Sequence, residues 1–184
     1  MSSSSFDYEN VHSILLRECA LVLSSGPTTE RMLAERLRTL LAFLGSEDVQ
    51  RALEHDSEKI KKILPARYIV LDTMTTVLKA NRTRKPEKVP SRRAASKETD
   101  DIALRCISCC LEKLNTRRSL WKDSSRFWKI LDVVVCTLTG SNADMKSSSA
   151  DEATKMSCVN ALASLFSHKH YEQDLFRLTK DSQN

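Results

Sequence analysis

The sequence predicts an all-α protein, and three observations support this fold class. Apolar residues recur at intervals of three and four along most of the chain, which is the period of an amphipathic helix. The 184 residues include only 3 Gly and 4 Pro, too few for the many tight turns of a β-rich protein. The apolar fraction of 41% is sufficient for a core, and no run reaches the roughly 18 consecutive apolar residues of a membrane span.

Residues 7–80 are predicted to form N-terminal helices after a polar, disordered leader over residues 1–6. Asp7–Ser24 is the first helix, and Gly26-Pro27 ends it. A second helix begins at Thr28 or Thr29 and ends at Gly45. The apolar stripes consist of Val11, Ile14, Leu15, Cys19 and Val22 in the first helix, and of Met32, Leu33, Leu37, Leu40, Leu41 and Leu44 in the second.

The segment over residues 46–78 allows alternative interpretations at two points. A short helix begins at Ser46, and a further helical run begins at Ser57. Pro65 either kinks that helix or stands near the first position of a new one. The run from Tyr68 to Leu78 is rich in β-branched residues and resembles a strand, but its period favours a helix.

Residues 81–97 are predicted to be a mobile basic linker, because they contain almost nothing to bury. Its cations loosely resemble a bipartite nuclear-import signal and could also contact an acidic partner. A solvated loop without a binding role is the third interpretation. The segment contains no aromatic residue, which argues against stacking on nucleic-acid bases. The candidate contacts are Arg82, Arg84, Lys85, Arg92 and Arg93.

Residues 98–178 are predicted to be a helical-repeat segment, followed by a frayed tail over residues 179–184. Helices over residues 102–114 and 127–138, the second capped by Ser124 or Ser125, are expected to pack antiparallel. Neither can bury its apolar stripe alone, so the pattern favours hairpins stacked as a short HEAT/armadillo-like α-solenoid. The complete chain would contain about seven helices.

The last long helix is predicted to begin at a capping box formed by Ser149 and Glu152 and to reach Ser167. Its second apolar side is predicted to be a docking edge for a following repeat or a partner. The predicted inward residues are Met156, Val159, Leu162, Ala163 and Phe166, and the predicted docking edge consists of Cys158, Ala161 and Leu165.

The clearest candidate for chemistry is Cys106-x-x-Cys109-Cys110. A structural zinc site needs four ligands, and no second Cys or His pair stands at a matching spacing. On a helix these three thiols share the core face, so packing is the favoured interpretation. All six cysteines fall within helical patterns, which is typical of a reduced cytosolic or nuclear protein. The sequence contains no recognisable catalytic or phosphate-binding motif, so we expect no enzyme activity and no cofactor.

Four short segments, in this order, resemble the N-terminal region of a known family. They are Ile63-Leu64-Pro65, Ile102–Ile107, Leu138-Thr139-Gly140 and Ala161–Phe166. The family is that of the Tel-two-interacting protein one, a HEAT-repeat subunit of the Triple T co-chaperone complex. Its members are much longer chains, so the resemblance concerns an N-terminal part only.

This resemblance implies a non-enzymatic protein-binding scaffold in the cytoplasm, with the nucleus as a second location. The implied partners are Tel-two and Tti-two type subunits and large phosphatidylinositol-3-kinase-related kinases, whose maturation and stability the complex supports. The alternatives are another HEAT or armadillo scaffold, or a nuclear, nucleic-acid-associated helical module that uses the basic linker. Membrane association is not expected.

Overall fold

The computed structural model describes residues 8–24, 30–47, 49, 57–83, 90–112, 120–139 and 151–167. Within these ranges all regular secondary structure is helical, so the predicted all-α class is confirmed for them. The helices are α1 (Tyr8–Ser24), α2 (Glu30–Gly45), α4 (Ser57–Thr83), α5 (Pro90–Leu111), α7 (Ser124–Thr139) and α8 (Glu152–Phe166).

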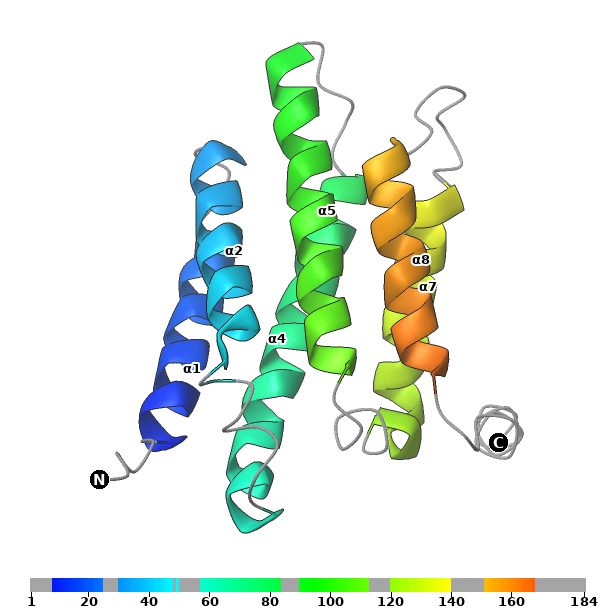
Figure 1. Cartoon of the computed structure of the whole chain (residues 1–184). Coiled ribbons are helices and arrows are strands. Elements are labelled where there is room, and N and C mark those ends of the chain that lie inside the picture. Colours follow the sequence, from blue (N-terminus) through cyan, green and yellow to red (C-terminus); the bar gives the residue numbers. More distant parts are fainter. Residues whose placement is uncertain are drawn as a thin grey trace.

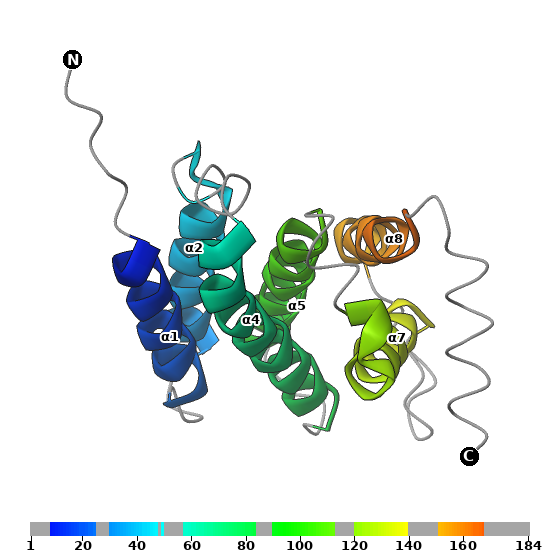
Figure 2. The same ribbon diagram turned by 90° about the horizontal axis from the view of Figure 1, so that it is seen from below.

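The helices form three antiparallel pairs that lie side by side. α1 packs against α2, α4 against α5, and α7 against α8 (Figure 1). Between the pairs, α4 contacts both α1 and α7, and α5 contacts both α2 and α8. The end view therefore has two rows, one of α1, α4 and α7 and the other of α2, α5 and α8 (Figure 2).

The predicted hairpin between the helices at 102–114 and 127–138 is wrong. Among the described residues, α5 packs mainly on α2, α4 and α8, whereas α7 packs on α4 and α8. The reason is that α5 is buried on more than one side. The successive residues Ile102, Ala103 and Leu104 are all buried, which a helix with a single apolar stripe does not allow.

The core faces of α1 and α2 largely agree with the sequence pattern. Leu15 and Leu37 are completely buried, and α2 ends at Gly45 as predicted. The prediction is wrong for Met32, which is 51% exposed, and the predicted Ile14 and Leu41 are only half-buried. The confirmed core positions in these two helices are Val11, Leu15, Cys19, Val22, Leu33, Leu37, Leu40 and Leu44.

One continuous helix spans the two segments that Pro65 divides in the sequence. α4 runs from Ser57 to Thr83, so no new helix begins at Pro65. The β-branched run from Tyr68 to Leu78 lies within α4, and the helical interpretation is therefore confirmed.

The predicted mobile linker over residues 81–97 is wrong at both of its ends. α4 includes residues 81–83, and α5 begins at Pro90 and includes residues 90–97. Proline suits the first position of a helix, and Ala, Arg and Lys are strong helix formers, so a polar sequence can extend α5 before its buried part. Residues 84–89 lie outside the described part of the chain.

Two helix starts use aspartate rather than the predicted serines. The Asp123 carboxylate accepts a hydrogen bond of 3.1 Å from the Arg126 amide at the start of α7. At the start of α8, the Asp151 carboxylate accepts a bond of 2.9 Å from the Thr154 amide. Ser149, the predicted cap, lies outside the described residues. An aspartate cap satisfies a free amide and also places negative charge at the positive end of the helix dipole.

We expect the substitution Asp151→Ala to lower the free energy of unfolding by about 1 kcal/mol, because the Thr154 amide loses its acceptor. The same hydrogen bond lowers the pKa of the Asp151 carboxyl. Urea denaturation at pH 7 measures the effect, and Asp151→Asn is the matched control because asparagine also caps helices. Equal unfolding midpoints for the alanine variant and the wild type would contradict the assignment of the cap.

Candidate functional site

The structure does not bring the five predicted basic contacts together within its described part. Burial raises the pKa of Asp100, and Arg82, near the end of α4, partly opposes that increase. Arg92 and Arg93 belong to the α5 backbone, but their side chains lie outside the described residues. Arg84 and Lys85 lie outside them altogether. The import and acidic-partner roles of this segment therefore stay predictions.

The predicted docking edge on α8 is wrong, because its three residues form part of the core. Cys158, Ala161 and Leu165 are each at most 1% exposed, whereas Met156 and Val159, predicted to point inward, are 62% and 49% exposed. Apart from Leu165, the buried face of α8 is made of small side chains, which let it approach α5 closely.

A polar contact fixes this orientation of α8. The Ser157 hydroxyl donates a hydrogen bond of 2.6 Å to the Asp101 carboxylate of α5. Hydrophobicity alone could not predict which face of α8 is buried, since apolar residues are distributed almost all around this helix.

The cysteine cluster is part of the core. Cys106 and Cys110 are buried and all six cysteines are free thiols. Burial raises the pKa of Cys110 to about 12, so this thiol stays protonated and is a poor nucleophile at neutral pH. Within the described ranges, no group of three or more His, Cys, Asp or Glu side chains is arranged to hold a metal ion.

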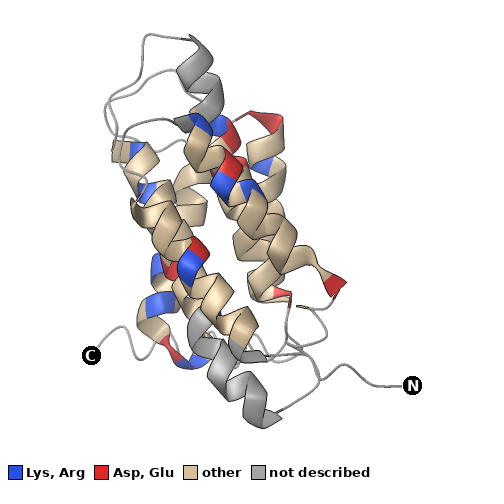
Figure 3. Cartoon of the chain, turned by 90° about the vertical axis from the view of Figure 1, so that its left-hand side faces the viewer, with Lys and Arg blue, Asp and Glu red and all other residues tan. Residues whose placement is uncertain are grey.

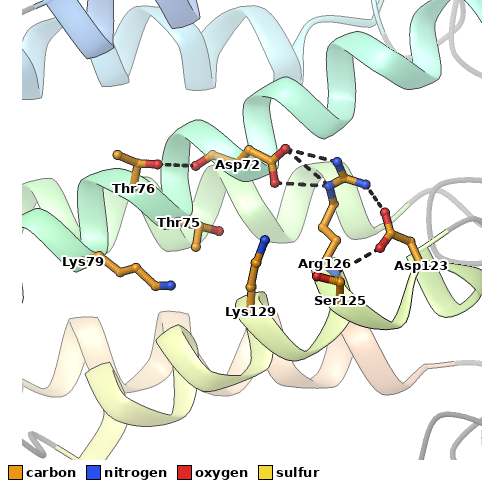
Figure 4. A pocket seen from close by; sticks show the side chains of 8 residues that line it. All are labelled: Asp72, Thr75, Thr76, Lys79, Asp123, Ser125, Arg126 and Lys129. Atoms are coloured by element: carbon orange, nitrogen blue, oxygen red, sulfur yellow. Dashed lines mark hydrogen bonds and ion pairs between the residues drawn. The ribbon is translucent and has the colours of Figure 1, made fainter. Parts of the chain in front are cut away.

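A cavity of about 430 Å³ lies between α4 and α7 and is the candidate site (Figure 4). We call it the α4/α7 pocket. Every residue that lines it is polar or charged, and all but Asp123 come from these two helices. The lining residues are Asp72, Thr75, Thr76, Lys79, Asp123, Ser125, Arg126 and Lys129.

One end of the pocket is closed by an ion-pair network around Arg126. Its guanidinium donates to both carboxylate oxygens of Asp72, with an Nε–Oδ1 distance of 3.1 Å and an Nη2–Oδ2 distance of 3.2 Å. It also pairs with the Asp123 carboxylate and lies over the Tyr68 ring, 4.4 Å from the centroid. The hydrogen bond to Asp72 raises the pKa of Arg126 further, so the cation is permanent. One arginine therefore pairs with both carboxylates of the pocket, and this end keeps a net formal charge of −1.

The other end of the pocket holds two lysines that have no ion-pair partner among the described residues. The ammonium groups of Lys79 and Lys129 point into the space between α4 and α7 (Figure 4). The hydroxyls of Thr75 and Thr76 donate within α4, to the carbonyls of Leu71 and Asp72, and so are available only as acceptors. This arrangement can hold an anion by charge.

Sequence reasoning did not find Lys79 and Lys129. Each lies on the exposed face of its helix, where a lysine is unremarkable. Only the contact between α4 and α7 brings them to one pocket. No local motif could have indicated this pairing.

A second polar cluster joins α4 to α5, near the start of α8. The Asn81 amide donates a hydrogen bond of 2.8 Å to the Asp100 carboxylate. Burial raises the pKa of Asp100 to about 6, and the nearby Asp151 adds to the increase, while Asn81 and Arg82 oppose it. This carboxyl therefore changes its protonation state close to physiological pH.

Opposite charges are interspersed on the described surface at the α1/α2 end of the molecule (Figure 3). Arg17 pairs with Glu18, Arg31 with Glu35, and Arg38 with Glu98. This end therefore presents no broad surface of one sign to a nucleic-acid backbone.

Comparisons of the chain with protein-family models, curated proteins and solved structures return no match. The family resemblance noted in the sequence therefore stays a prediction. No described helix has the length and apolar character needed to cross a lipid bilayer.

Proposed function

We propose that the chain is a non-enzymatic, protein-binding scaffold made of stacked HEAT/armadillo-like hairpins. The observation that carries this proposal is the arrangement of three antiparallel helix pairs in two rows, with the central pair in contact with both outer pairs. In such an array each unit buries its apolar face against its neighbours, and the long outer surface is available to partners.

The more specific form of the proposal is a co-chaperone subunit that supports the maturation of phosphatidylinositol-3-kinase-related kinases. It is based on the four short segments that resemble, in the same order along the chain, the Tel-two-interacting protein one family. In this form the scaffold works in the cytoplasm, together with Tel-two and Tti-two type subunits.

Reconstitution with purified components tests this function. The full chain is mixed with Tel-two and Tti-two type subunits and analysed by size-exclusion chromatography with light scattering. A stoichiometric complex is the expected result. If the subunits elute separately from the chain at micromolar concentrations, the co-chaperone form of the proposal is wrong. A variant with an unfolded core is the control. It should form no complex, because the contact needs the folded chain.

A further inference from the structure

We propose that the α4/α7 pocket binds an acidic side chain from an extended Asp- or Glu-rich segment of a partner protein. This inference rests on the proposed scaffold function and names the chemistry that one of its binding sites recognises. The lysine pair at the open end of the pocket carries the argument.

Charge within the pocket is divided between its two ends. Arg126 pairs with Asp72 and Asp123, so this end has a net formal charge of −1 and does not attract an anion. Lys79 and Lys129 are exposed and have no counter-ion among the described residues. Two ammonium groups that share one cavity repel each other, and a carboxylate bound between them offsets this repulsion by attracting both.

A carboxylate suits this pocket better than a phosphate group does. Phosphate recognition in proteins commonly uses the planar fork of an arginine, and the Arg126 fork is already bound to Asp72. A phosphate also brings about two negative charges close to Asp72 and Asp123, whose repulsion opposes it. A single carboxylate matches the formal charge of the lining, which comprises three positive and two negative side chains.

The lining also favours a protein segment over a small molecule. Sites for small molecules are mostly apolar and enclose the greater part of their ligand. Here every lining side chain is polar or charged, and both lysines are exposed to solvent. A carboxylate on a peptide can enter between Lys79 and Lys129 while its backbone remains on the surface, with the Ser125 hydroxyl as a further donor.

The test measures binding of a fluorescent peptide of alternating Glu and Gly to the full chain by fluorescence anisotropy. The variant is the double substitution Lys79→Gln with Lys129→Gln. We expect it to weaken binding of the peptide about five- to tenfold, as two partly exposed charge pairs are lost. The matched control is Lys122→Gln with Lys155→Gln, which removes the same charge elsewhere and should change the affinity by less than about twofold.

The outcomes separate this inference from its alternatives. If the two double variants weaken peptide binding equally, the peptide responds only to the net charge of the protein, and the proposed site is wrong. Undetectable binding by the wild type, or equally tight binding of a peptide with Gln in place of Glu, would also overturn it. Tighter binding of duplex DNA with the same lysine dependence would instead make the pocket a nucleic-acid contact. If the peptide binds in a lysine-dependent way but no complex forms with Tel-two type subunits, the pocket is supported and only the co-chaperone function is rejected.

Discussion

Replacing Phe127 with alanine is expected to lower the free energy of unfolding by about 3–5 kcal/mol, the usual range for removing a buried phenylalanine. Phe127 is completely buried at the start of α7. Its ring centroid lies 4.7 Å from that of Trp121, 5.4 Å from that of Trp128 and 6.0 Å from that of Phe166. The substitution leaves a cavity at the centre of this aromatic cluster.

The cluster connects three segments, which is why the effect should be large. Trp121 precedes α7 and donates a hydrogen bond of 3.2 Å from Nε1 to the Leu165 carbonyl of α8. Its ring also lies edge-on to Phe166 at the end of α8. The loss of Phe127 therefore loosens the contact between α7 and α8 as well as its own packing.

Guanidinium denaturation measures this effect, with the fluorescence of Trp121 and Trp128 as the signal. The control is Val135→Ala on the same helix, where the side chain is already 38% exposed. It should cost less than about 1 kcal/mol. If the two variants unfold at the same denaturant concentration, the aromatic cluster does not hold α7 and α8 together.

The substitution Asp100→Asn is expected to stabilise the protein at pH 7 by about 1–3 kcal/mol, because it removes the cost of burying a charged carboxylate. Burial raises the pKa of Asp100 to about 6 in the folded chain, whereas an unfolded aspartate titrates near 3.9. Between about pH 4 and pH 6, the folded state therefore keeps a proton on Asp100 that the unfolded state has released. Above pH 6 the buried carboxylate is charged and destabilises the fold. As the pH falls from about 6 to about 4, protonation removes this cost.

Asparagine removes the charge but keeps the contact. Its amide oxygen can accept the hydrogen bond that Asn81 donates to Asp100 at 2.8 Å. The stability difference between the variant and the wild type should thus be greatest at pH 7 and vanish near pH 4. Thermal unfolding across this range measures it. Asp132→Asn, at an exposed site on α7, is the matched control for the chemical change itself. A variant less stable than the wild type at pH 7 would show that the charged form of Asp100 is favourable.

Helical periodicity in the sequence correctly predicted the core where one face of a helix is apolar. α1 and α2 are examples, since Leu15 and Leu37 belong to regular stripes and are completely buried. It failed on α8, whose apolar residues surround the helix. Cys158 and Ala161 are buried there, while the larger Met156 is exposed. Close approach to α5 selects small residues, and the Ser157–Asp101 hydrogen bond selects the rotation of the helix.

The polar residues gave less reliable predictions than the apolar ones. Residues 90–97 have no apolar stripe, and their sequence predicts a loop, yet they extend α5. A helix needs favourable backbone propensities and a start signal such as Pro90, and it does not need burial along its whole length. The basic candidates Arg82 and Arg92, predicted from a cation pattern that loosely resembles a bipartite import signal, are not joined into a site by the described residues.

The sequence by itself determined the fold class and most of the helices, because the 3.6-residue period is a local property of the chain. The tertiary structure decided which helices pair, and it placed α5 between α2, α4 and α8 rather than against α7. It also created the α4/α7 pocket by bringing Lys79 beside Lys129. Their proximity depends on which faces two distant helices turn toward each other, and the local pattern of residues does not contain that information.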